Sequence, residues 1–243
     1  EKFKDKIIYL VYENQPKEIQ EINDGDSVTE KSIKFILNAG YRENAQRNYI
    51  KHGLTEAKEN DIILISDVDE IPNLQNIKFN EINKKIILFK QNMFYYKFNL
   101  HLPNLIWTGT KACKKRDLIN PQWLRNTKDR KYPFYRFDTL FSKNKHRSIE
   151  YIINGGWHFT NIKNAEQIEH KLKSYLHHRE FEVDPLSVKQ INEIIKNKRA
   201  IYNLSVDKTE SKFENGNKLE KFELKGLPIY IQENLNNFKE WID

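Results

Sequence analysis

Short apolar runs, separated by charged stretches, predict how the chain divides into strands and helices. Residues 7–12 are apolar on both faces and predict a strand buried between helices, as in a parallel sheet. Residues 29–58 predict a helical region that breaks near its two glycines. Residues 61–72 form a second apolar run that ends in acids and is stopped by Pro72, so we expect another buried strand there.

The middle and end of the chain follow different patterns. Residues 86–89, 92–100 and 105–113 are rich in aromatic and β-branched side chains and predict strands that extend the sheet in antiparallel fashion. Three helices are expected after them, starting at Asn164, at Asp184 (running to about Lys198) and at Pro228 (running to Trp241). The predicted fold class is therefore α/β, with a Rossmann-type, mostly parallel sheet flanked by helices and an antiparallel extension.

Composition narrows the class of protein. The chain has 243 residues, 38% of them hydrophobic, and a net charge of +7, which suits one globular domain over 1–243 with a core at about 7–200 and a helical segment at about 223–243. Acids are interleaved with the basic residues, so we expect no nucleic-acid partner. Cys113 is the single cysteine, which excludes an internal disulfide and a cysteine-based zinc cluster.

The sequence also bears on location. It contains neither an apolar stretch long enough to span a membrane nor a signal peptide, so we expect no transmembrane segment and a cytoplasmic protein. The abundance of Lys, Asn and Ile suggests a bacterial or viral origin.

Paired acids end the predicted strand at 61–72. Because strand side chains alternate, Asp67 and Asp69 are expected on one face at the carboxyl end of the strand, where open α/β sheets bind ligands. Two carboxylates that close repel each other unless a cation lies between them, and Mg²⁺ or Mn²⁺ suits oxygen ligands. The alternative is that these acids and Glu70 cap a turn before Pro72, since Asp is common in turns.

At this segment the chain resembles glycosyltransferase family 17. The resemblance rests on Ile65-Ser66-Asp67-Val68-Asp69-Glu70-Ile71-Pro72, together with Arg47-Asn48-Tyr49-Ile50, Gly53-Leu54, Trp107-Thr108-Gly109-Thr110, Gly155-Gly156-Trp157-His158-Phe159, Glu166-Gln167-Ile168 and Lys171-Leu172. These segments follow the family order over about residues 42–180. The resemblance implies a GT-A-like fold, a nucleotide-sugar donor such as UDP-N-acetylglucosamine, Mn²⁺ or Mg²⁺, and inversion at the sugar carbon. Family members begin with a further strand and helix that this sequence lacks.

The resemblance also implies where the donor and its metal bind. Asp69 would be the principal metal ligand, Asp67 would share the metal or contact the ribose, and His158 would complete the metal shell or touch the diphosphate. An alternative for His158 is a packed, hydrogen-bonded histidine between two aromatic neighbours. Glu70 is expected to brace a loop.

Further donor and acceptor contacts follow from the same resemblance. Arg47 and Lys171 are expected at the diphosphate. Trp157 is expected at the nucleotide sugar, whereas Trp107 and Gly109 are expected at the glycan acceptor, because glycine allows backbone to approach a ligand closely.

An inverting transfer requires a carboxylate that accepts the proton of the attacking hydroxyl. Glu166, in the first turn of a predicted helix, is the first candidate and Asp138 the second, and spacing does not decide between them. An acid in a first turn is also explained by the helix dipole alone.

Two other classes of function compete with sugar transfer. A metal-dependent phosphoesterase or nuclease would also place paired acids at a strand end, but it requires more acids or histidines than the sequence offers nearby. A non-enzymatic nucleic-acid-binding protein would use the positive charge and the aromatic middle strands.

Overall fold

The computed structural model describes residues 3–174, 181, 185–202 and 216–243. Its contacts cluster into two compact units, each built from separated parts of the chain. Unit 1 contains residues 1–65, 84–86 and 112–149, and unit 2 contains residues 66–83, 87–111 and 150–243.

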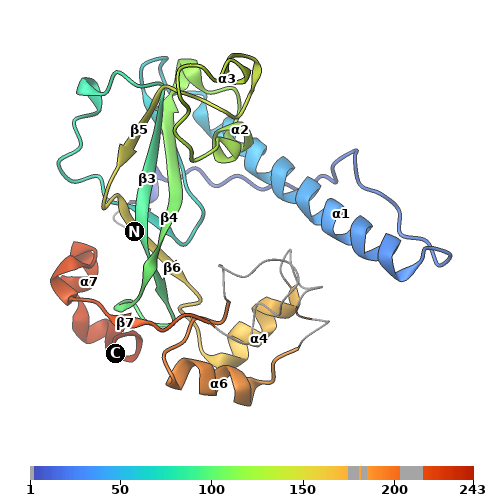
Figure 1. Ribbon diagram of the computed structural model, residues 1–243, viewed down its shortest axis with the longest axis vertical. Coiled ribbons are helices and arrows are strands. Elements are labelled where there is room, and N and C mark those ends of the chain that lie inside the picture. The colour runs from blue at the N-terminus through green and yellow to red at the C-terminus, as the bar shows by residue number, and fades with distance from the viewer. Residues whose placement is uncertain (1–2, 175–180, 182–184, 203–215) are drawn as a thin grey trace. The chain divides into compact units, whose positions relative to one another are not determined.

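The strands form a mixed sheet that is mostly antiparallel (Figure 1). They are β1 (Ile62–Ile65), β2 (Glu70–Pro72), β3 (Ile86–Tyr95), β4 (Leu100–Lys114), β5 (Ile149–Ile152), β6 (Gly156–Thr160) and β7 (Glu220–Lys221). The hydrogen-bonded order is β1-β4-β3-β6-β2, with β5 beside β3 and β7 beside β4. β6 is parallel to β3 and antiparallel to β2.

The expectation of a mostly parallel sheet is therefore wrong. The connection between β3 and β4 is only a few residues long, and a parallel pair requires a crossover of about a dozen residues or more. The long aromatic strands in the middle of the sequence are the main body of the sheet and not an extension of it.

Residues 7–12, the first predicted strand, pair with no strand among the residues that the structure describes. They follow the short helix η1 (Lys4–Lys6), and Ile7, Ile8 and Tyr9 are exposed. An apolar run becomes a buried strand only where a neighbouring strand accepts its hydrogen bonds, and this run has no such neighbour.

The first long helix, α1 (Val28–Tyr49), belongs to unit 1 and passes through Gly40 without a break. It begins with a capping box, in which the Glu30 amide donates to Ser27 Oγ (3.2 Å) and the Ser27 amide donates to Glu30 Oε2 (2.9 Å). One glycine costs a helix only about 1 kcal/mol relative to alanine, so a well-capped helix of this length tolerates it.

The described residues also form several shorter helices. Unit 1 contains η2 (Ile50–Leu54), η4 (Lys115–Asp117), α2 (Pro121–Asn126) and α3 (Asp138–Phe141). Unit 2 contains η3 (Phe79–Glu81), α4 (Ala165–Ser174), α6 (Val188–Lys196), η5 (Leu224–Gly226), α7 (Ile229–Glu233) and η6 (Leu235–Trp241). The expected start of the second late helix at Asp184 lies outside the described residues, and α6 is capped by Ser187.

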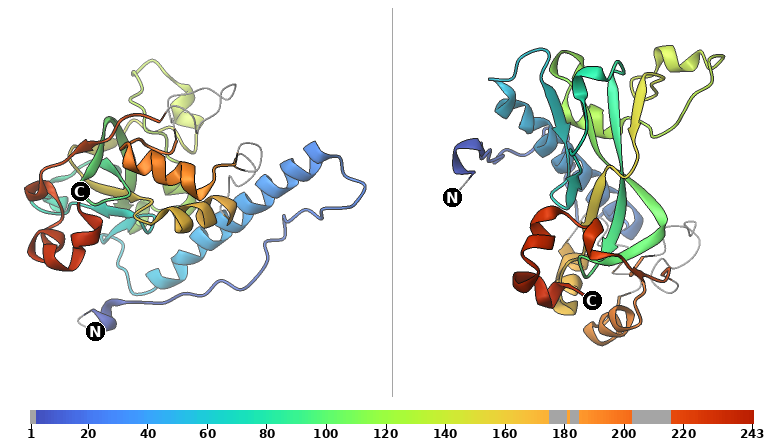
Figure 2. Two further views of the ribbon diagram at one scale, coloured as in Figure 1. Left: turned by 90° about the horizontal axis from the view of Figure 1, so that it is seen from below. Right: turned by 90° about the vertical axis from the view of Figure 1, so that its left-hand side faces the viewer.

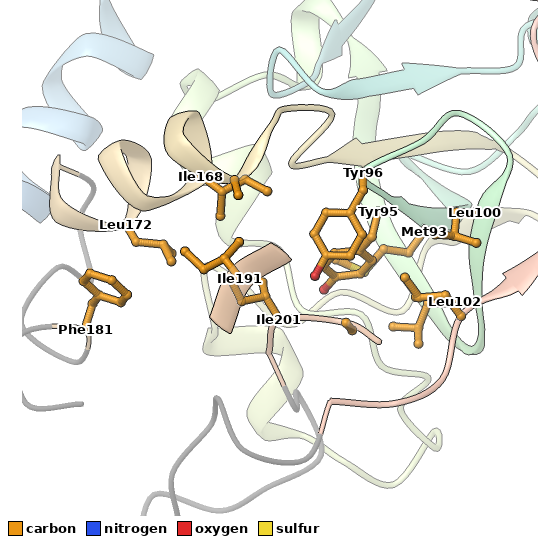
Figure 3. Packing of buried hydrophobic residues seen from close by; sticks show 13 residues of the cluster. Met93, Tyr95, Tyr96, Leu100, Leu102, Ile168, Leu172, Phe181, Ile191 and Ile201 are labelled. Atoms are coloured by element: carbon orange, nitrogen blue, oxygen red, sulfur yellow. The ribbon is translucent and has the colours of Figure 1, made fainter. Parts of the chain in front are cut away.

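The core of unit 2 lies on both faces of its strands. On one face, side chains of β3 and β4 pack against α4 and α6, and the labelled members are Met93, Tyr95, Tyr96, Leu100, Leu102, Ile168, Leu172, Phe181, Ile191 and Ile201 (Figure 3). A second cluster packs Phe94 and Phe159 against Leu227 and Ile231. The aromatic residues of β3 are therefore core residues.

The C-terminal residues are fastened to the turn between β3 and β4. The Phe98 amide donates to the Trp241 carbonyl (2.8 Å), and the Asp243 amide donates to Asn99 Oδ1 (2.8 Å). The Lys97 ammonium group donates a hydrogen bond to the Glu240 carbonyl oxygen. Both ends of this contact belong to unit 2, and the right-hand view of Figure 2 shows the C-terminus close to the ends of the long central strands.

Cys113, in the part of β4 that belongs to unit 1, is expected to resist thiol reagents in the folded protein. Its side chain is buried, and burial followed by the charge of Asp117 raises the pKa of the thiol to about 12, so little thiolate exists at pH 8. We expect labelling by a disulfide reagent to be slow in buffer and fast in denaturing urea. Rapid labelling without urea would contradict the burial.

Candidate functional site

The acidic segment after β1 folds as a turn, all of it within unit 2. The Glu70 amide donates to the Asp67 carbonyl (3.0 Å), and Val68 at the tip is fully exposed. Asp67 and Asp69 therefore lie in the turn between β1 and β2, and the argument from strand alternation was wrong. The backbone turns there because Asp is a favoured turn residue and Pro72 follows two residues after Glu70.

Glu70 holds this turn in place, as the sequence predicted. Its carboxylate is buried and accepts hydrogen bonds from the Asp67 amide (3.0 Å) and from Trp107 Nε1 (2.9 Å). A buried carboxylate is costly unless it is hydrogen-bonded, and these two donors satisfy Glu70. Trp107 of β4 is thereby fixed beside the turn.

Asp69 and His158 meet across the β2–β6 pair. Glu70 is the Cα partner of His158, and the Phe159 amide donates to the Asp69 carbonyl (2.8 Å). This register brings His158 Nε2 to 3.4 Å from Asp69 Oδ2. The Trp107 ring lies against the imidazole with a centroid distance of 4.9 Å. His158 is buried, and its Nδ1 atom has no hydrogen-bond partner among the residues that the structure describes.

Lys171 of α4 adds positive charge to the same region. It donates to Asn161 Oδ1 (2.8 Å), and Asn161 is a buried residue with a φ of 52°. Burial lowers the pKa of Lys171, and the Asp69 charge opposes that effect only in part. For Asp69, burial disfavours the carboxylate, but the His158 hydrogen bond and the His158 and Lys171 charges outweigh it and lower the pKa.

An open hollow of about 470 Å³ lies along α4. Its lining residues are Lys163, Glu166, Gln167, His170, Lys171 and Ser174. Helical spacing places these residues opposite Ile168 and Leu172, which face the core. Glu166 is exposed in this hollow and shares it with Lys171. Within unit 2 the structure thus brings together Asp69, His158 and Trp107, with the charge of Lys171 acting on Asp69, and it places Glu166 in the hollow that Lys171 also lines.

Gly109 is buried, and no side chain larger than a hydrogen atom fits at its position. A Cβ at this position would lie 1.7 Å from Gln91 Oε1 and 3.0 Å from Glu70 Cδ. Gln91 donates to Thr110 Oγ1 (3.3 Å), whereas its Oε1 atom is buried without a partner. Because Gly109 has no side chain, the backbone of β4 can lie close to the side chains of Gln91 and Glu70.

Three further predicted site residues make other contacts. Trp157 donates its Nε1 proton to the Gly226 carbonyl (2.8 Å) and packs against the second core cluster of unit 2. Arg47, in unit 1, bonds Gln122 Oε1 (2.5 Å) and Glu43 Oε1 (2.7 Å). Asp138, also in unit 1, is paired with Arg136 and Lys145, whose hydrogen bonds lower its pKa.

Sequence reasoning missed Lys163, His170, Gln91 and Asn161. His170 shares the exposed face of α4 with Glu166 and Lys171, so helical spacing could have found it, and Lys163 lies two residues before that helix. Gln91 is a single polar residue within an apolar strand, which is a weaker indication that a residue belongs to the site. No local pattern marks Asn161 as a partner of Lys171.

The region holds metal-ligating side chains in a pair and not in a larger cluster. Among the residues that the structure describes, no three His, Cys, Asp or Glu side chains gather closely enough to hold a metal ion. Asp69 and His158 supply two donors, with Asp67 in the same turn.

In comparisons with protein-family models, curated proteins and solved structures, nothing matches this chain. No helix within the described ranges combines the length and the apolar character that crossing a membrane requires.

Proposed function

We propose that the chain is an inverting, metal-dependent glycosyltransferase that transfers a sugar, with UDP-N-acetylglucosamine as the expected donor, to a hydroxyl of a glycan acceptor. The observation that carries the proposal is the convergence of Asp69, His158 and Lys171, with Glu166 in the hollow that Lys171 lines. The Asp-x-Asp turn and the other segments shared with glycosyltransferase family 17 support it.

Mn²⁺ or Mg²⁺ fits these protein ligands if the diphosphate of the donor supplies the remaining oxygen ligands. Mg²⁺ is usually bound through one or two carboxylates together with substrate phosphates, so a site completed by a diphosphate needs few protein ligands. Asp69 and His158 would hold the ion, with Asp67 as a further oxygen donor. The buried, unpartnered Nδ1 atom of His158 is consistent with an imidazole whose hydrogen bonding is incomplete without a ligand. When bound, the ion would neutralise charge on the departing diphosphate.

The chain's own residues would bind the donor and accept a proton. Lys171, half-buried beside Asp69, would bind a phosphate oxygen. The acceptor oxygen forms a bond to the anomeric carbon, the bond to the diphosphate oxygen breaks, and a carboxylate takes the hydroxyl proton. Glu166 suits this role better than Asp138, because the pairing of Asp138 with two cations makes it a weak base.

The test is a calorimetric titration of the full chain with UDP and with UDP-N-acetylglucosamine. We expect binding in the presence of Mn²⁺ that disappears when excess chelator is added. Binding that is equally strong with chelator would contradict the metal's role, and absence of binding under all these conditions would contradict a nucleotide-sugar site. Transfer is then measured as UDP release with a panel of glycan acceptors.

A further inference from the structure

A second feature lies in unit 1, between α2 and β5. Residues 128–147, which we term the aromatic loop, form a long loop whose two ends are joined by hydrogen bonds. The Lys128 amide donates to the Asn144 carbonyl (2.8 Å), and Trp123 Nε1 of α2 donates to the Lys143 carbonyl (2.6 Å). Compact loops whose ends are held close are frequently functional.

The inside of the aromatic loop is ordered by polar contacts. Asp138 accepts hydrogen bonds from Arg136 Nε (2.7 Å) and Lys145 Nζ (2.8 Å), which joins the two halves of the loop. Thr139 is buried and donates its hydroxyl proton to the Arg136 carbonyl (2.7 Å). The single turn of α3 is held in this way, so the outward direction of its apolar side chains is fixed by the fold.

The tip of the aromatic loop exposes large apolar side chains to solvent. Phe134 is 83% exposed, Phe141 is 89% exposed and Leu140 is 68% exposed. Tyr135 and Phe137 are also exposed. Five such residues lie within eight positions of the sequence, and two of them belong to α3, which is labelled in Figure 1. Large apolar side chains exposed close together in this way often mark an interaction site.

Positive charge is concentrated in the same segment of the sequence. Residues 128–147 contain seven Lys or Arg and two Asp, a net charge of +5 against +7 for the whole chain. The exposed cations include Lys128, Arg130, Lys143 and Arg147. Asp138 is paired with Arg136 and Lys145, so its charge is compensated inside the loop.

We propose that the aromatic loop binds the surface of a membrane containing anionic lipids, with Phe134, Leu140 and Phe141 inserted at the headgroup level. Phe and Leu favour the boundary between headgroups and acyl chains, and Lys and Arg are attracted to anionic headgroups. Single-stranded nucleic acid is the other anionic partner with apolar surface, but Leu140 cannot stack on a base as an aromatic ring does. The proposal does not depend on the sugar-transfer reaction.

The experiment is sedimentation of the full chain with phosphatidylcholine vesicles that contain or lack phosphatidylglycerol. We expect binding only to the vesicles with phosphatidylglycerol, weakened by added salt. The double substitution Phe134→Ser and Phe141→Ser is expected to lower the vesicle partition coefficient about tenfold or more. The double substitution Lys128→Gln and Lys143→Gln is expected to lower it about tenfold while leaving the apolar tip intact.

The matched control removes equally exposed apolar side chains outside the loop. Val28 is 78% exposed and Tyr230 is 67% exposed, so the variant with Val28→Ser and Tyr230→Ser should bind as the parent chain does. Thermal unfolding verifies that all variants are folded. The proposal is overturned if the parent chain does not bind the anionic vesicles, if loop and control variants bind equally, or if oligothymidylate binds the loop and displaces the vesicles.

Discussion

Gly156→Ala should lower the free energy of unfolding by about 3 kcal/mol or more, because no alanine fits at this position. Gly156 has a φ of 133°, and a Cβ there would lie 2.1 Å from the Ile71 carbonyl oxygen and 2.9 Å from the Pro72 Cα. Both obstacles are backbone atoms of β2, the antiparallel partner of β6. The substitution must therefore push apart the pair of strands that joins Asp69 to His158.

Urea unfolding measures this effect, and a second glycine provides the control. Gly40 lies inside α1, and a Cβ at that position would meet nothing within 4 Å. Gly40→Ala should therefore stabilise the protein by about 0.5–1 kcal/mol, the ordinary gain for alanine over glycine in a helix. If the two substitutions changed stability by the same amount, the close approach of β2 to Gly156 would be refuted.

Asp69→Asn should reduce sugar transfer about a hundredfold or more, since the amide keeps the shape of the side chain but removes its charge. We expect Mn²⁺-dependent binding of the donor to weaken in parallel. Circular dichroism should show an unchanged fold, because the hydrogen bond from the Phe159 amide uses the Asp69 backbone carbonyl and not its side chain. UDP release and calorimetry measure the two quantities.

Asp24→Asn is the control for this experiment. Asp24 is an exposed acid in the loop before α1, so its replacement removes the same charge from the chain without touching the turn after β1. Its transfer rate should equal that of the parent chain. A full rate in the Asp69 variant would remove this carboxylate from the proposed mechanism.

Local signals in the sequence predicted local structure well. Asn164 and Gln167 exchange the two hydrogen bonds of a capping arrangement at the start of α4, as their spacing indicated. The apolar residues Ile168 and Leu172 of this helix, which lie four positions apart, both face the core. Such features depend on residues three or four positions apart, so a single segment contains the information.

Features that depend on distant partners were not predictable in the same way. Residues 7–12 have the composition of a buried strand but pair with no strand in the part of the chain that the structure describes, and no property of the segment itself reveals this. Trp157 and His158 are adjacent in sequence yet take opposite faces of β6, one against the second core cluster and the other against Asp69. Which of them meets Asp69 is fixed by the register of β2 and β6.

The candidate site was predictable only in part, because some of its features are local and others depend on distant residues. The acids after β1 were found as a motif, whereas their position in a turn depends on the hydrogen bonds that Glu70 accepts. The aromatic residues of the middle strands, which suggested nucleic-acid binding, are used in the core of unit 2, where Phe94, Tyr95 and Tyr96 are buried.

The contact between the β3–β4 turn and residues 241–243 has a consequence for the order of folding. Asn99 and Asp243 are separated by 144 positions, and contacts of such long range form slowly because the intervening chain must first be brought together. During synthesis on the ribosome, Phe98 and Asn99 remain without these partners until residues 241–243 have emerged. Unit 2 therefore completes its folding only after these residues have been synthesised and released from the exit tunnel.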